Sequence, residues 1–66
     1  MTRGELQQLE KVTKQLYKEL VEFKDIAEIL DLSLTDVIYL ILADQESKWM
    51  RFKHRDIGII KHIPKL

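Results

Sequence analysis

The residues best suited to bind a ligand lie close together near the end of this 66-residue chain. They interleave with two aromatic residues, Trp49 and Phe52, and comprise Lys48, Arg51, Lys53, His54 and Arg55. Cations in such a series can track the phosphates of a nucleic-acid backbone. For the two aromatic side chains, packing inward on a small core is the preferred interpretation. The segment therefore predicts contact with phosphate through its cations.

No pattern indicates catalysis or a metal site. The two histidines, His54 and His62, are eight positions apart and lack the close spacing of a metal pair on one helix. Gly4 and Gly58 stand alone and form no phosphate-binding loop. Cysteine is absent, which excludes disulfides and thiolate metal sites. We expect a protein that is not an enzyme and that uses no cofactor or metal.

The charges are unevenly distributed along the chain. Residues 1–46 carry five basic and ten acidic side chains, and residues 47–66 carry six basic and one acidic. The two parts thus have charges of −5 and +5, which sum to the net charge of zero. This asymmetry predicts either a basic end that meets a polyanion or an attraction between opposite ends of two copies.

The length predicts a single domain over residues 1–66. A chain of this size buries only about 60% of its unfolded surface, so we expect it to dimerise or to dock on a partner. No apolar run approaches the ~20 residues that span a bilayer, and the N-terminus lacks the apolar core of a signal peptide. We expect a soluble, cytoplasmic protein that does not enter a membrane.

The elements that must position the cations begin with a long helix, predicted over residues 5–22. Its apolar residues recur every three or four positions, as Leu6, Leu9, Val12, Leu16, Leu20 and Phe23. The favoured interpretation is a helix that closes the core of the domain. Because this helix is longer than two short helices can cover, we also expect part of its stripe, through Leu9, Leu16 and Leu20, to meet a second subunit.

Residues 24–42 predict two short helices joined by a tight turn. Ile26 and Leu30 give the first helix its apolar face. Asp31 tolerates the left-handed backbone that ends a helix sharply. Ser33 can cap the second helix, and Asp36 completes a capping box three residues later.

This pattern resembles the helix-turn-helix of small DNA-binding domains. Ala27 occupies the position at which that family has a small residue, and Asp31 occupies the turn position usually held by glycine. Leu32 falls between the helices, while Val37 and Leu40 fall at the buried positions of the recognition helix. The resemblance implies a small three-helix domain that binds duplex DNA.

The outward positions of that second helix are chemically mixed. Three of them, Ser33, Thr35 and Tyr39, can hydrogen-bond to bases or phosphates. Three others, Leu34, Ile38 and Leu42, offer only apolar contact. Asp36 would repel phosphate, and the helix holds no basic residue. Such a surface reads bases poorly and is better suited to contact with protein.

The remaining residues, 47–66, form a basic tail. Residues 43–47 predict a loop, and the alternation of apolar and basic side chains over 49–52 predicts a short strand. Two alternatives remain for the residues after this strand. Residues 57–60 pair with 49–52 as a hairpin, or a final short helix begins at Asp56 and ends at Pro64.

The tail resembles that of excisionase-like and MerR-like winged domains. The residues that carry this second resemblance are Phe52, Asp56, Ile57 and Ile60. Together the elements predict a mainly α fold, a small three-helix helix-turn-helix domain with either a short β-wing or a fourth short helix at its C-terminus.

Two functions are compatible with these features. The first is a dimeric DNA-binding regulatory protein, either a transcriptional regulator or a recombination-accessory factor, with residues 48–55 on the phosphates. The second is a helix-turn-helix-derived interaction module that does not read DNA and instead binds another regulatory protein or a polymerase subunit. The first is favoured narrowly, because the turn motif and the basic tail agree with each other.

Overall fold

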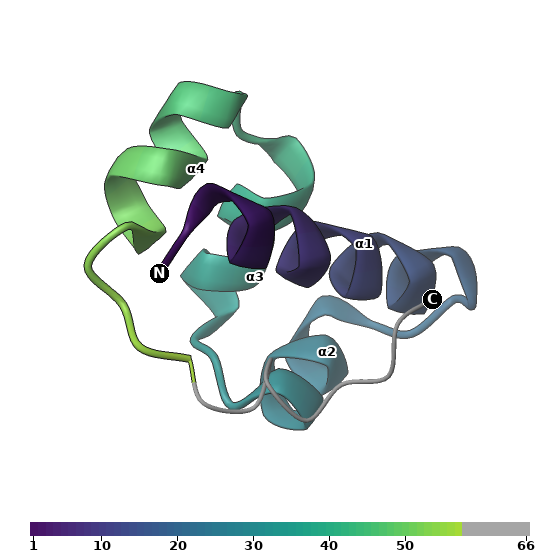
Figure 1. Cartoon of the computed structure of the whole chain (residues 1–66). Coiled ribbons are helices and arrows are strands. Elements are labelled where there is room, and N and C mark those ends of the chain that lie inside the picture. Colours follow the sequence, from purple (N-terminus) through teal and green to yellow (C-terminus); the bar gives the residue numbers. More distant parts are fainter. Residues whose placement is uncertain (58–66) are drawn as a thin grey trace.

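The computed structural model describes residues 1–57, which contain four helices and no strand (Figure 1). The helices are α1 (Arg3–Lys18), α2 (Phe23–Leu30), α3 (Leu34–Leu42) and α4 (Gln45–Phe52). The expected mainly α fold is confirmed. None of these helices is both long and apolar enough to cross a membrane.

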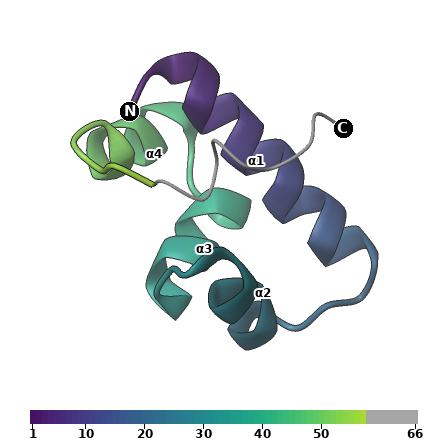
Figure 2. The ribbon, with the colours of Figure 1, turned by 60° about the horizontal axis from the view of Figure 1, so that its bottom comes forward.

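Helix α3 is the central element of the arrangement. It contacts all three other helices, and it lies between α2 on one side and α4 on the other (Figures 1 and 2). Each helix contributes to one hydrophobic core, whose buried residues are Leu6, Leu9, Val12, Ile26, Ala27, Leu30, Val37, Leu40 and Phe52. The apolar stripe of the first helix therefore packs mainly on its own chain.

Helix α1 ends four residues earlier than the predicted boundary at residue 22. After Lys18, the chain reverses through Leu20, whose backbone is left-handed with φ of 63°. The N–H of Val21 donates to the carbonyl of Leu16 at 3.2 Å and closes this turn. A left-handed backbone costs a leucine roughly 1–2 kcal/mol, so glycine would be the usual residue here.

At its N-terminus, α1 begins two residues before the predicted start. Thr2 caps the helix through a capping box with Glu5.

The two short helices and their turn are confirmed. Asp31 has a φ of 54° and ends α2, and the N–H of Leu32 donates to the carbonyl of Ala27 at 2.8 Å. Ser33 caps α3 and forms the expected capping box with Asp36. Hydrogen bonds between residues close in sequence therefore define the turn between α2 and α3.

The predicted strand at 49–52 is wrong, and the predicted loop at 43–47 is limited to residues 43 and 44, because residues 45–52 form α4. Its N-terminus is capped by Asp44, whose side chain accepts from the N–H of Ser47 at 2.7 Å. This hydrogen bond holds the pKa of the Asp44 carboxyl below its usual value. Trp49 and Phe52 are three residues apart, so they share one face of the helix and both pack toward the core.

The same correction removes the hairpin alternative for the tail, since its first strand is helical. A fourth short helix is present, although it begins at Gln45 and not at Asp56. The alternative of a helix running from Asp56 to Pro64 falls almost entirely outside the described residues, as does Ile60 of the second resemblance.

We expect Ala27→Leu to destabilise the domain by about 1–3 kcal/mol, because Ala27 is buried in the core and a larger side chain would overpack it. For a chain of this length, each 1 kcal/mol lowers the melting temperature by roughly 4–8 °C. Thermal unfolding monitored by circular dichroism measures the effect. The control is Ile29→Leu, which changes an exposed residue of the same helix. An unchanged melting temperature for Ala27→Leu would mean that α2 does not pack as described.

Candidate interaction surface

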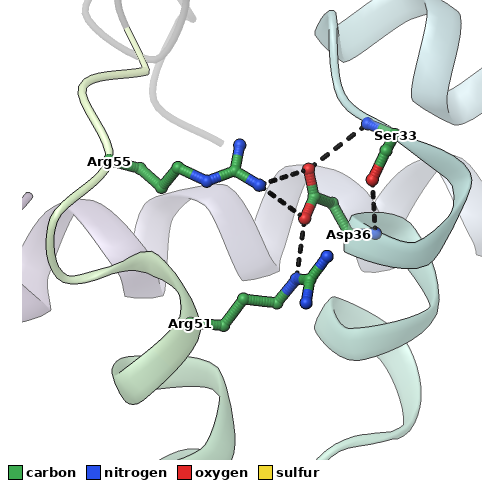
Figure 3. A network of polar contacts seen from close by, with 4 residues as sticks. All are labelled: Ser33, Asp36, Arg51 and Arg55. Atoms are coloured by element: carbon green, nitrogen blue, oxygen red, sulfur yellow. Dashed lines mark hydrogen bonds and ion pairs between the residues drawn. The ribbon is translucent and has the colours of Figure 1, made fainter.

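A buried carboxylate joins α3 to α4 and to the segment after it. Asp36 lies in the first turn of α3 and is 1% exposed. Its Oδ1 accepts a hydrogen bond from Arg51 Nε at 2.7 Å, and Arg55 Nη2 donates to Oδ1 and Oδ2 at 2.8 and 2.9 Å (Figure 3). The backbone N–H of Ser33 donates to Oδ2 at 3.3 Å. One acidic side chain thus holds two guanidinium groups.

These contacts keep Asp36 ionised. Burial by itself would raise the pKa of the Asp36 carboxyl. The hydrogen bonds from Arg51, from Ser33 and from Arg55 outweigh burial, and the pKa lies below its usual value. At neutral pH the cluster therefore contains one negative and two positive charges.

Both arginines are also held by aromatic rings. The guanidinium of Arg51 lies 4.4 Å from the centre of the Tyr39 ring, and that of Arg55 lies 5.7 Å from the centre of the Phe52 ring. Asp36 uses only Nε of Arg51 and only Nη2 of Arg55. The two side chains remain 30% and 43% exposed, and each guanidinium has further N–H groups that Asp36 does not bind.

Lys48, in contrast, points into the molecule. It is 3% exposed, and its Nζ lies 3.5 Å from Oε1 of Glu10, a buried residue of α1. Gln45 donates from Nε2 to the other oxygen of Glu10 at 3.3 Å. The guanidinium of Arg3 lies 4.5 Å from the centre of the Trp49 ring. Polar contacts therefore hold α4 against α1 as well as against α3.

The five cations predicted to bind phosphate thus have different surroundings in the structure. Lys48 is buried, and Arg51 and Arg55 bind Asp36. Lys53 is half-buried and His54 is exposed. Two of the ten acidic residues in positions 1–46, Glu10 and Asp36, thus pair within the molecule with three cations of the basic part. No local spacing predicts this pairing, because Asp36 lies 15 and 19 residues from its two partners.

The outward face of α3 is apolar. Leu34, Ile38 and Leu42 are spaced four residues apart, so they share one face of the helix. Their exposed fractions are 49%, 37% and 72%. We term these three residues the α3 stripe. It contains no charged residue.

The three polar residues predicted beside this stripe have different surroundings. Thr35 is exposed, whereas Tyr39 is half-buried beneath the guanidinium of Arg51. The Ser33 hydroxyl accepts from the N–H of Asp36 at 3.1 Å as the helix cap. Ser33 and Tyr39 are therefore used in contacts within the fold.

The three leucines predicted for a dimer through α1 do not share a surface. Leu9 is fully buried in the core, and Leu16 is half-buried against it. Leu20 is 91% exposed, but it lies in the turn after the helix. Because α1 ends at Lys18, the excess apolar stripe that was expected to meet a second subunit is largely absent.

Comparison of this chain with protein-family models, with curated proteins and with solved structures finds no match. Over residues 1–57, no group of three or more histidine, cysteine, aspartate or glutamate side chains is arranged to hold a metal ion. The features that remain as a candidate site are the α3 stripe and the charged residues beside it.

We expect Asp36→Asn to lower the stability at pH 7 by about 1–3 kcal/mol, the usual cost of losing hydrogen bonds to charged groups. The loss should shrink at low pH. The folded pKa of Asp36 lies below the unfolded value near 3.9, so its contribution is full above about pH 4 and falls as pH drops through the folded pKa. Urea unfolding at pH 7 and pH 3 tests this, with Glu19→Gln as an exposed control. An equal loss at both pH values would contradict the role assigned to the charge.

We expect Lys48→Met alone to cost about 3 kcal/mol or more, because it leaves the buried Glu10 carboxylate without its cation. Glu10 Oε1 has no hydrogen bond, so the pair is not fully satisfied. The double variant Glu10→Leu/Lys48→Met should therefore recover most of the lost stability. A double-mutant cycle by urea unfolding measures the coupling. Additive losses in the double variant would show that the two side chains do not act as a pair.

Proposed function

We propose that this chain is a protein-interaction module that docks on another protein through the α3 stripe. The observation that carries the proposal is the exposure of Leu34, Ile38 and Leu42 along one face of the central helix. Amphipathic helices commonly bind proteins through apolar residues at this spacing.

The composition of α3 supports the same conclusion. Its inner side is buried by Val37 and Leu40, and Ile41 packs against the core as well. Three further large apolar residues then occupy the outer side, so that the helix is apolar around most of its circumference. A helix with this distribution is usually buried on all sides. Within residues 1–57, the inner side and the side of Asp36 and Tyr39 are covered by the other helices, and the proposed partner covers the α3 stripe.

Base reading is the less favoured use of this face. Helices that read the major groove present arginine, lysine, asparagine or glutamine to base edges, and the α3 stripe offers none of these. The predicted contact between the tail cations and the phosphates of duplex DNA stays a prediction. Anisotropy of a labelled duplex, titrated at low and moderate salt, measures it, because phosphate contacts weaken steeply as salt rises.

Photocrosslinking tests the proposed docking face. Ile38 is replaced with the photoreactive amino acid p-benzoylphenylalanine, and the protein is irradiated in the cells that produce it. We expect one discrete adduct that is sensitive to protease and resistant to nuclease. The adduct should be lost when Leu34→Ser is added, because this change removes an apolar contact without adding charge.

The matched control carries the same photoreactive residue at Met50, which is 57% exposed on α4 and lies outside the stripe. We expect it to give no such adduct. A nuclease-sensitive adduct at Ile38 would instead favour DNA, and equal labelling from both positions would contradict a specific docking face.

A further inference from the structure

We propose that the α3 stripe is covered by a second copy of this chain. In this dimer, the acidic side of α2 in one copy faces Arg51 and Arg55 of the other. The inference rests on the proposed function and names the partner that occupies the same face.

The two flanks of the α3 stripe carry opposite charge. Helix α3 lies between α2 and α4 in both views (Figures 1 and 2). On the α2 flank, Asp25, Glu28 and Asp31 are exposed, and the exposed Lys24 of the same helix pairs with Glu22. On the α4 flank lie the exposed parts of Arg51 and Arg55. The two helices beside α3 thus carry exposed charge of opposite sign, mainly acidic on α2 and basic on α4.

This charge pattern selects one symmetry. When two copies meet face to face about a two-fold axis parallel to α3, the acidic flank of each copy lies opposite the basic flank of the other. An axis running across α3 would place like charges together, which is unfavourable. A closed two-fold dimer also uses the same patch on both subunits, so each charged contact forms twice.

The arginine pair is prepared for such a contact. Asp36 and the rings of Tyr39 and Phe52 hold the two guanidinium groups in place within each chain. A side chain that is already ordered loses little conformational entropy when it binds. The donors of Arg51 and Arg55 that Asp36 does not use can each accommodate a carboxylate, and Glu28 of a second copy supplies one.

The size of the surface requires both flanks. A stable interface buries about 800 Å² on each partner, which is less than a fifth of the 4510 Å² accessible surface of this chain. Three partly exposed side chains cannot supply that area by themselves. The interface must extend onto α2 and α4, where the charges lie.

Sedimentation velocity over the micromolar range tests the dimer. We expect the unmodified chain to be dimeric and Ile38→Glu to be monomeric, since the change buries a charge at the centre of the interface. Leu20→Glu, which adds the same charge at a 91% exposed residue in the turn after α1, should remain dimeric. Circular dichroism of each variant verifies that it is folded. A monomeric unmodified chain would overturn the dimer, whereas an Ile38 adduct with a different protein would still support the docking face.

Charge reversal tests the arrangement of the two copies. Glu28→Lys should weaken dimerisation by about tenfold or more at low salt and by less at high salt. Glu19→Lys makes the same change in net charge on an exposed residue at the C-terminus of α1, and it should leave the dimer unchanged. Equal effects of the two reversals, or a dimer that Ile38→Glu does not weaken, would overturn the proposal.

Discussion

The buried carboxylate of Asp36 is the contact on which the position of α4 depends. Apolar anchoring of this helix is limited to Phe52, which is fully buried, and Trp49, which is half-buried. A buried charge without a partner costs several kcal/mol, so Asp36 must meet Arg51 and Arg55 as the helix docks. Apolar contacts favour burial in many orientations, whereas a two-guanidinium contact with one carboxylate permits few. The polar cluster therefore specifies where α4 lies.

This placement determines what is left on the outside of α3. The guanidinium of Arg51 lies over the Tyr39 ring, and Asp36 forms ion pairs with Arg51 and Arg55. Asp36 and Tyr39 are thereby covered by their own chain, whereas Thr35 stays exposed. Within residues 1–57, the large apolar residues of α3 that remain exposed are those of the α3 stripe. The same interactions that complete the fold thus remove the groups most able to contact DNA from the centre of the surface, which is why a protein partner is the better candidate.

Features set by local chemistry could be predicted from the sequence, and features set by tertiary contacts could not. The turn at Asp31, the cap at Ser33 and the stripe at Leu34, Ile38 and Leu42 all depend on spacing within a few residues. The end of α1 gave no such signal, because Leu20 occupies a left-handed position normally marked by glycine. The alternation of apolar and basic residues around Trp49 fits a strand as well as a helix. Which of the two forms depends on contacts with residues far away in the sequence. Those partners, Asp36 and Glu10, also decide which cations remain accessible.

The asymmetric charge of the chain is used in part within the fold. Of the ten acidic residues in positions 1–46, Glu10 and Asp36 neutralise cations of the basic part within the molecule. Within residues 1–57, no ion pair joins an acidic residue of α2 to a cation of α4, and α3 lies between the two helices. The acidic residues of α2 remain as an acidic flank opposite a partly neutralised basic one. In the proposed dimer, each copy places its acidic flank against the basic flank of the other, an arrangement that α3 prevents within one copy.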